Sequence, residues 1–141
     1  MHEMIGFNFK FTDIQAVLGI VQMGKLDWRV KRMKEIYARY KNNLSNIEEI
    51  QFFEQDLINT TPWFIDIKAK KRDDLMAYLK LNNIGSRIMY PPINKQQAYN
   101  VEGEHIVSNE IGVVGLWLPS SSKLTDKQID YVCNSIREFY N

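Results

Sequence analysis

Two apolar helical stripes between residues 12 and 44 restrict the fold of this chain, because they do not share a face. In each stripe the apolar side chains recur every three or four residues, as on one side of an amphipathic helix. The first stripe comprises Ile14, Val17, Leu18 and Val21, and the second comprises Val30, Met33, Tyr37, Tyr40 and Leu44. Continuing the first stripe reaches positions 25, 28 and 32, of which only Trp28 is apolar. The segment therefore forms either two helices that break near Gly24–Asp27, or one helix of roughly 50 Å, at ~1.5 Å per residue, that buries opposite faces at its two ends.

Two capping boxes mark where helices begin. Thr12 is followed three residues later by Gln15, and Thr125 by Gln128. In this pattern the threonine side chain and the glutamine side chain each bind the other residue's backbone N–H group. We expect one helix to start after Thr12 and another after Thr125. The second helix continues as a single apolar stripe made of Ile129, Val132, Cys133, Ile136, Phe139 and Tyr140.

The middle of the chain alternates between strand and helix patterns. In residues 63–67, Trp63, Ile65 and Ile67 are expected on one face of a strand. Further patterns predict a weaker strand at 50–53, a helix over 71–82, strands over 85–90 and 113–118, and a short helix around 104–111. The fold class is therefore α/β of the α+β type: a long N-terminal helix or helix pair, and a small antiparallel or mixed sheet of about three strands with helices on one face. We divide the chain into an arm and interdomain helix segment (1–44) and a small domain (45–141).

Composition excludes several classes of protein. Of 141 residues, 45% are hydrophobic, which is enough apolar side chain to form a core. Lys+Arg is 18 and Asp+Glu is 17, a net charge of +1, so no nucleic-acid partner is expected. His2 and His105 are far apart and the chain has one cysteine, Cys133, so no metal site is expected, and Cys133 belongs to the core. With no run of ~18 apolar residues and no signal-peptide pattern, we expect a cytoplasmic protein that does not bind membranes.

Two polar segments stand out as candidate sites. In residues 6–11, Asn8 and Lys10 alternate with three phenylalanines just before the capped helix. The segment is either an edge strand or extended arm that packs its phenylalanines, or an anion site formed with the N-terminus of the helix. Residues 86–99 place Arg, Tyr, Asn and Gln side chains around Pro91-Pro92. This segment is either a polar binding lip or an ordinary surface loop.

Four blocks of sequence resemble one family of enzymes. Residues 6–19, GFNFKFTDIQAVLG, resemble the Gly-aromatic-Asn-aromatic-Arg-x-Thr-Asp-Ile-Gln-Ala-Ala-x-Gly block of the DegT/DnrJ/EryC1/StrS family. The other blocks follow in the family's order: residues 84–99, residues 115–119 and the closing helix from residue 124 to 137. These relatives are pyridoxal-phosphate-dependent aminotransferases that act on keto sugars attached to nucleotides. The resemblance covers essentially the whole chain.

The resemblance implies a fold and a set of roles. It implies the C-terminal small domain of a fold-type-I aminotransferase that works as a homodimer with pyridoxal phosphate as its cofactor. Asn8 matches an Asn that reaches the cofactor phosphate of the neighbouring subunit, and Lys10 stands where the family has Arg nearby. The substrate segment is matched by Arg87, Tyr90, Asn94, Gln96 and Tyr99. Asn94 aligns with the family's His that faces the substrate pocket, and Asn does not titrate near neutral pH.

The family's cofactor-binding lysine has no counterpart in this sequence. None of its 12 lysines lies in the family's lysine motif, so no catalytic residue is expected in this chain. We therefore expect the C-terminal portion of an enzyme that transfers an amino group, from glutamate, to a keto-sugar nucleotide in deoxyamino-sugar or polysaccharide biosynthesis, inactive on its own. The alternatives are a non-catalytic relative that serves as a dimerisation or ligand-binding module, and an unrelated α/β scaffold.

Overall fold

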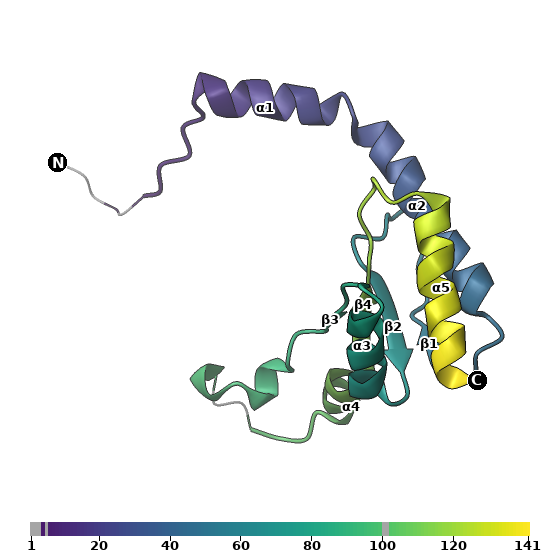
Figure 1. The fold of residues 1–141 in the computed structure, drawn as a ribbon. Helices are drawn as coiled ribbons and strands as arrows, with labels where there is room; N and C mark the ends of the chain where they lie inside the picture. The colour runs from purple at the N-terminus through teal and green to yellow at the C-terminus, as the bar shows by residue number, and fades with distance from the viewer. Residues whose placement is uncertain (1–3, 5, 100–101) are drawn as a thin grey trace.

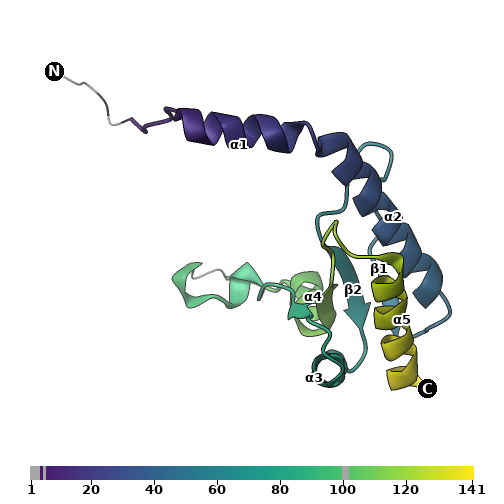
Figure 2. The same ribbon diagram turned by 45° about the horizontal axis from the view of Figure 1, so that its top comes forward.

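The computed structural model describes residue 4, residues 6–99 and residues 102–141 (Figure 1). His2 lies outside the described residues. The fold begins with a helix pair, α1 (Asp13–Met23) and α2 (Leu26–Leu44). The two helices meet at an angle in both ribbon views, so the phase difference between the apolar stripes corresponds to a real break (Figures 1 and 2).

The joint between α1 and α2 consists of Gly24 and Lys25. Gly24 caps α1, and its N–H donates to the carbonyl of Ile20 over 3.1 Å. Lys25 leaves the helical region, with φ −105° and ψ 1°. One side-chain hydrogen bond spans the joint, from Nη2 of Arg29 to Oε1 of Gln22 over 2.6 Å. The change of direction therefore takes place over two residues.

The sheet has four strands rather than about three, and every neighbouring pair is antiparallel. Its spatial order is β1-β2-β4-β3. The strands are β1 (Ile50–Phe52), β2 (Ile65–Ala69), β3 (Arg87–Ile88) and β4 (Gly115–Leu118). The weak strand pattern at 50–53 supplies the additional edge strand. Because β4 enters the sheet between β2 and β3, it joins segments that are distant in the sequence.

One face of the sheet carries the core. There α2 packs along α5 (Asp126–Tyr140), and α3 (Arg72–Leu81) packs against both α5 and β2 (Figure 2). The fully buried side chains of largest volume come from all these elements: Tyr40, Ile36, Leu44, Ile65, Ile67, Leu75, Leu79, Leu116, Ile129, Ile136 and Cys133. Side chains alternate between the two faces of a strand, so the neighbours of Ile67 point to the other face. One of them, Lys68, pairs with Glu110 of α4 (Ile106–Val114) over 3.5 Å, which places α4 on that side, so the helices are not confined to one face of the sheet as expected.

Three strand predictions need correction. Trp63 does not share the buried face of Ile65 and Ile67, because regular pairing of β2 begins only at Ile65, and the Trp63 side chain is 82% exposed. The strand expected over 85–90 contains only the two residues of β3. The strand expected from residue 113 begins at Gly115, because α4 continues through Val114. The helix over 71–82, both capping boxes and the break after α1 are confirmed.

Charged side chains connect α2 to α5 along the outer edge of this core. The Arg39 guanidinium donates to both carboxylate oxygens of Asp130, over 2.8 and 2.6 Å, and Asn43 donates to Asp130 over 3.1 Å. The hydrogen bond from Arg39 holds the pKa of the Asp130 carboxyl below its usual range. Behind these residues Cys133 is buried as expected, and burial raises the pKa of its thiol to about 11. The thiol therefore stays protonated at neutral pH.

The division of the chain at residue 44 remains a proposal. Ile36, Tyr37, Tyr40 and Leu44 of α2 share the core of residues 45–141, whereas no residue of α1 is buried. In both ribbon views α1 and the arm before it extend away from the body formed by the sheet and the other helices (Figures 1 and 2). In the described part of the chain, no helix has both the length and the apolar composition needed to cross a bilayer.

Candidate functional site

The arm before α1 presents polar groups to solvent. Oδ1 of Asn8 accepts a hydrogen bond from the backbone N–H of Lys10 over 3.1 Å, so the carbonyl end of this side chain is occupied by the local turn. Its Nδ2 group and the Lys10 ammonium remain exposed. Thr12 then caps α1, with Thr12 Oγ1 accepting from the Gln15 N–H over 3.3 Å. The arm therefore offers one amide donor and one cation beside the positive end of a helix.

The arm neither joins the sheet nor packs its phenylalanines against the body. Phe7 and Phe9 are each 84% exposed and Phe11 is 79% exposed. Phe7 and Phe9 contact each other, with ring centroids 6.0 Å apart. Residues 6–11 therefore form an extended arm and not an edge strand. Within the described residues, the phenylalanine rings of the arm contact no other aromatic ring apart from the Phe7–Phe9 pair.

The second candidate segment starts at β3, where the structure brings Arg87 and Tyr90 together. The Arg87 guanidinium lies 5.0 Å from the centroid of the Tyr90 ring and 5.7 Å from that of Trp117. Tyr90 meets Trp117 edge to face at 5.0 Å. Two aromatic rings thus hold the charged head of Arg87 in place through cation–π contacts.

Beyond Tyr90 the segment folds onto α4. It forms two short 3-10 turns, Ile93–Lys95 and Gln97–Tyr99. The Asn94 Nδ2 group donates to Oδ1 of Asn109 over 2.9 Å, and the Gln96 Nε2 group donates to the carbonyl of Pro91 over 3.2 Å. Asn94 is therefore engaged with α4, while Tyr99 is exposed. The segment is an ordered excursion from the sheet.

Two glycines allow this excursion to lie close to α4 and β4. A Cβ atom at Gly112 would come within 2.7 Å of the Pro92 ring, and one at Gly115 within 2.5 Å of the Met89 sulfur. Arg72 supports the same region from α3, since its Nη1 donates to the Gly112 carbonyl over 3.0 Å. The side chains of residues 87–99 therefore project from a segment that packs tightly against α4 and β4.

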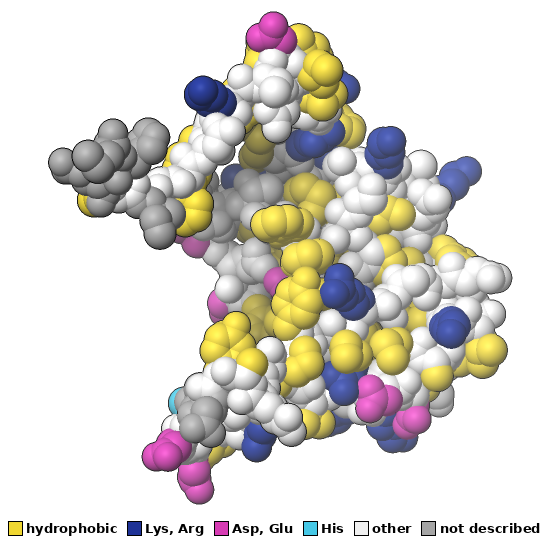
Figure 3. Space-filling view, turned by 90° about the vertical axis from the view of Figure 1, so that its left-hand side faces the viewer, with side chains coloured by type: hydrophobic (Ala, Val, Ile, Leu, Met, Phe, Trp, Pro, Cys, Tyr) yellow, Lys and Arg dark blue, Asp and Glu magenta, His cyan; other side chains and the backbone are white. Residues whose placement is uncertain are grey.

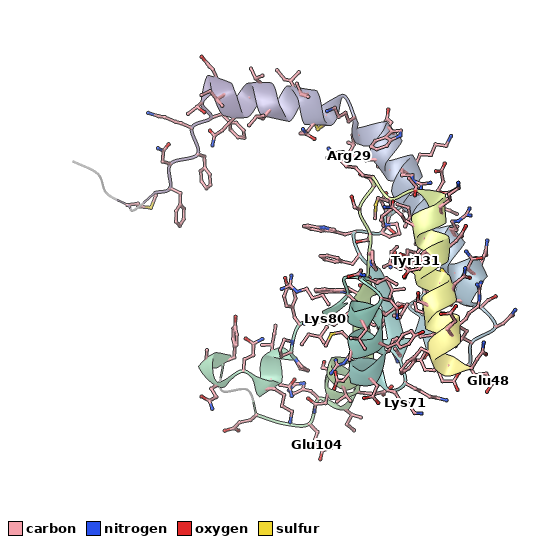
Figure 4. All side chains as sticks on the ribbon, in the orientation of Figure 1. Arg29, Glu48, Lys71, Lys80, Glu104 and Tyr131 are labelled. Atoms are coloured by element: carbon pink, nitrogen blue, oxygen red, sulfur yellow. The ribbon has the colours of Figure 1, made fainter. Side chains whose placement is uncertain are left out.

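The arm and the 87–99 segment lie on opposite sides of a hollow. They occupy separate ends of the molecule in both ribbon views, and their side chains do not meet across the space between them (Figures 1, 2 and 4). The space-filling view shows hydrophobic side chains gathered on the hollowed face (Figure 3). Within one copy of the chain, Asn8 and Lys10 therefore do not join Arg87 and Tyr90 in a single site.

Asp66 and Trp117, with Phe64 beside them, lie on the face of the sheet opposite the core and were not predicted as site residues. Asp66 of β2 pairs in register with Trp117 of β4, which pairs with Arg87 of β3, so these residues form one row across the sheet. Phe64 stacks on Trp117, with centroids 4.3 Å apart. The available signal was Asp66 itself, an acidic residue that interrupts an otherwise apolar strand pattern.

Asp66 is in an unusual environment for a carboxylate. Burial raises the pKa of the Asp66 carboxyl, and the nearby Trp117 indole acts in the opposite direction. The indole Nε1 is itself buried without reaching hydrogen-bonding geometry. Gln55 Nε2 approaches the carboxylate at 3.5 Å, a long hydrogen bond. The row therefore contains an acid, an aromatic ring and a cation side by side.

The residues of the arm fit part of a cofactor site. A phosphate group accepts hydrogen bonds and carries negative charge, and the exposed Nδ2 of Asn8 and ammonium of Lys10 can satisfy both needs. The described residues contain no group of three or more His, Cys, Asp or Glu side chains placed to hold a metal ion.

Family membership follows from a match that extends over almost the whole sequence. The model of the DegT/DnrJ/EryC1/StrS aminotransferase family matches residues 1–137. The chain belongs to this family. Its resemblance in four blocks is thereby confirmed, as is the fold class expected for it.

Relatives of this chain are similar along almost all of its length. GDP-perosamine synthase of Escherichia coli O157:H7 is 30% identical over 144 residues, which cover 99% of this chain and 39% of that protein. A Bacillus subtilis protein named as a pyridoxal phosphate-dependent aminotransferase is 27% identical and covers 90% of this chain and 35% of that protein. A DegT/DnrJ/EryC1/StrS aminotransferase from Brucella abortus has a similar structure, with a TM-score of 0.83, 27% identity, and coverage of 91% of this chain and 35% of its own. The chain spans about two fifths of the length of the curated relatives it matches.

Proposed function

We propose that this chain is the C-terminal portion of a pyridoxal-phosphate-dependent aminotransferase that transfers an amino group from glutamate to a keto-sugar nucleotide. The observation that carries the proposal is the family match over residues 1–137, together with a fold that overlays on family structures. The names of relatives, such as GDP-perosamine synthase, support a nucleotide-linked sugar as the substrate class. A role in deoxyamino-sugar or polysaccharide biosynthesis in the cytoplasm follows from the same proposal.

In this proposal the arm holds the cofactor phosphate. Asn8 donates a hydrogen bond from Nδ2, and Lys10 supplies a positive charge without the two-pronged geometry of the family's Arg. When bound, pyridoxal phosphate supplies the electron sink that makes amino transfer feasible. The separation of the arm from residues 87–99 within one copy favours a homodimer in which Asn8 serves the neighbouring subunit's site.

The 87–99 segment is proposed to contact the substrate. Arg87 and Tyr90 present a cation and a phenol from the rigid end of β3, and Gln96 and Tyr99 lie further along the same excursion. The hydrogen bond of Asn94 to Asn109 points to a modified role at that position. We propose that Asn94 reaches the substrate through its carbonyl oxygen or its second N–H group and takes no part in proton transfer.

The arm can be tested through cofactor retention. In a complete enzyme that contains this sequence, Asn8→Ala removes a hydrogen bond to a charged group, worth roughly 1.5–3 kcal/mol, so retention is expected to weaken about tenfold or more. Mixing Asn8→Ala subunits with subunits that lack the cofactor lysine restores one intact site per heterodimer if Asn8 serves its neighbour. Confirmed heterodimers without restored retention would contradict the assignment across subunits.

The decisive experiment for the activity starts from the genome. The nucleotide sequence upstream of Met1 is read for an in-frame lysine motif, and the complete reading frame is expressed with the cofactor. The expected result is release of 2-oxoglutarate from glutamate only when a nucleotide keto sugar is supplied. The 141-residue chain alone is expected to give no turnover and no uniquely labelled lysine after borohydride reduction with the cofactor.

A second function is favoured by the exposed face of α1. Val17, Leu18 and Val21 are exposed on a helix that buries nothing within this chain. A non-catalytic relative that uses this helix for dimerisation would present the same surface. An upstream reading frame without a lysine motif, combined with stable dimers of the chain, would favour this alternative.

A further inference from the structure

Trp117 carries a buried hydrogen-bond donor that lacks an acceptor. Its side chain is 7% exposed, and the indole Nε1 is buried with no group in hydrogen-bonding geometry among the described residues. A buried N–H group without an acceptor costs free energy, because it has given up its hydrogen bond to water. An acceptor that reaches Nε1 would remove this cost.

The Asp66 carboxylate is the acceptor that the sheet places beside Trp117. Asp66 on β2 pairs in register with Trp117 on β4, so both side chains project from the same face of the sheet. The two groups are close enough for the indole N–H to act on the carboxyl: burial raises the pKa of Asp66, and the indole lowers it. The sheet therefore brings an unsatisfied donor and a carboxylate together.

The neighbouring charged groups leave the Asp66 carboxylate without a cation. Lys68, two positions along the same strand, pairs with Glu110 of α4 over 3.5 Å. Arg87 on β3 lies across Trp117 from Asp66, because β4 runs between β2 and β3. Among the side chains that the structure places, none forms an ion pair with Asp66.

The groups that reach this carboxylate from β1 and α2 do not supply a positive charge either. Burial, followed by the charges of Glu54 and Asp66, raises the pKa of the Tyr37 phenol on α2. Gln55, which follows β1, directs its Nε2 group at Asp66 over 3.5 Å. The donors within reach of Asp66 are therefore a distant amide and the Trp117 indole.

Trp117 is also a ring that holds Arg87. The guanidinium carbon of Arg87 lies 5.7 Å from the centroid of the Trp117 ring, and Tyr90 meets the same ring edge to face at 5.0 Å. The last side-chain torsion of an aromatic residue is broad and roughly two-fold, so packing alone restrains it weakly. A hydrogen bond at Nε1 selects one orientation of the ring, and the contacts of Arg87 depend on that orientation.

We propose that Asp66 is a positioning residue for Arg87: its carboxylate accepts a hydrogen bond from the Trp117 indole N–H, and this bond fixes the ring on which the Arg87 guanidinium lies. The bond satisfies the buried donor and gives the carboxylate a partner. The inference rests on the proposed function for the role of Arg87 as a substrate contact, whereas the hydrogen bond is a property of this chain alone.

The hydrogen bond is tested in the 141-residue chain through the NMR signals of its three tryptophan indole N–H groups, which Trp28→Phe and Trp63→Phe assign. Protonation of Asp66 should move the Trp117 signal upfield, with a midpoint above the usual pKa of an aspartate because burial dominates. Asp66→Asn should abolish this titration. Asp66→Ala should speed exchange of the Trp117 indole proton about tenfold or more, as for loss of a hydrogen bond to a charged group.

A matched control separates Asp66 from other acids on the same side of the sheet. Glu110→Gln removes a carboxylate that faces this side from α4, and the Trp117 signal should still titrate. The circular dichroism spectrum and melting temperature of each variant show that the chain remains folded over the pH range used.

The positioning role is tested through the Nε–H signal of Arg87, which Arg87→Lys identifies. Ring currents from Tyr90 and Trp117 should separate this signal from those of exposed arginines. Asp66→Ala should move it toward the exposed position, and Asp66→Asn should restore it, because an amide oxygen still accepts a hydrogen bond. Trp117→Phe keeps a ring without the donor, so in that background Asp66→Ala should have no further effect on the Arg87 signal.

Three results would overturn the inference. They are a Trp117 signal that does not titrate with Asp66, an Arg87 signal that is the same in Asp66→Ala as in wild type, and, in the complete enzyme, a KM for the keto-sugar nucleotide that Asp66→Ala leaves unchanged. We expect Asp66→Ala to raise this KM more than it lowers kcat, and Asp66→Asn to reverse the effect. A complete enzyme without transaminase activity would reject the proposed function, while the hydrogen bond stands or falls on the NMR signals.

Discussion

The helices α1 and α5 both begin at a threonine whose side chain accepts a hydrogen bond from the backbone of a glutamine three residues later. Their environments are nevertheless opposite, because α5 buries five residues and α1 buries none. The same local signal therefore starts a helix in both regions without deciding what the helix covers. Burial is decided by the rest of the chain, whose described residues supply a sheet, α2 and α3 for α5, and no covering element for α1.

The largest effect should come from removing core volume in one region and not in the other. Ile36 of α2 is 0% exposed and Ile14 of α1 is 76% exposed. Ile36→Ala should lower the free energy of unfolding by about 2–5 kcal/mol, because it removes buried methyl groups and leaves a cavity. Ile14→Ala should change it by less than about 0.5 kcal/mol, as for other exposed positions. Urea denaturation followed by circular dichroism measures both, and similar losses would show that α1 packs on the body in solution.

The next effect concerns association. Leu18 is 59% exposed on the unpartnered stripe of α1, and covering a side chain of this kind is worth about 1.5–3 kcal/mol. We expect the chain to self-associate through the arm and α1, and Leu18→Glu to weaken association about tenfold or more. Leu81→Glu is the matched control, since Leu81 is 83% exposed at the end of α3. Light scattering over a concentration series distinguishes the variants, and a wild-type chain that stays monomeric at high concentration would contradict the prediction.

The two capping boxes allow the same change in both regions. Thr125→Ala should lower the free energy of global unfolding by about 1 kcal/mol, the usual cost of losing an N-terminal cap. Thr12→Ala should leave global unfolding unchanged and increase only the fraying of α1, because α1 can open without exposing the core. Hydrogen exchange of the amides in α1 and α5, measured beside thermal unfolding, checks the pair. Equal shifts in melting temperature for Thr12→Ala and Thr125→Ala would contradict the expected difference between α1 and α5.

The smallest expected effect on stability is electrostatic and concerns the ion pair between α2 and α5. Because the pKa of Asp130 is lower in the folded chain than in the unfolded one, its contribution to stability is complete above the unfolded pKa and is lost as the pH falls through the folded pKa. Asp130→Asn should therefore reduce stability at neutral pH and flatten its decline in acid. Asp13→Asn in α1 is the comparison, and it should leave the acid dependence of global unfolding unchanged. If the ion pair with Arg39 contributes nothing, the melting temperatures of Asp130→Asn and Asp13→Asn will decline in parallel from pH 7 to pH 2.

Periodicity predicted the elements whose signal is local. The stripes on residues 12–44, the caps at Thr12 and Thr125 and the helix over 71–82 all depend on neighbours within four positions, and all are present in the structure. The family resemblance likewise depended on contiguous blocks, such as residues 6–19. For these features the local sequence is sufficient to predict the element.

The row on the open sheet face could not be predicted in this way. Asp66, Trp117 and Arg87 become neighbours only because β4 lies between β2 and β3, and this pairing joins Trp117 to residues 51 and 30 positions earlier in the sequence. Alternation predicts Trp63 on the same face as Ile65 and Ile67, but Trp63 precedes the regular strand, so alternation does not apply to it. Strand order and the exact start of pairing are tertiary properties, and the position of Asp66, Trp117 and Arg87 in one row depends on strand order.

The joint at Gly24 and Lys25 acts mechanically as the pivot of a lever. The 11 residues of α1 span about 16 Å at ~1.5 Å per residue, so a rotation of about 20° at the pivot moves the far end of the helix by about 6 Å. Arg29, seen beside the joint in Figure 4, stiffens it through a single hydrogen bond to Gln22. Asn8 precedes α1 and lies beyond the far end of this helix, so the same rotation moves Asn8 as well. A surface that covers the apolar stripe of α1 therefore also fixes the position of Asn8. Burial of the helix and positioning of the Asn8 amide are then coupled.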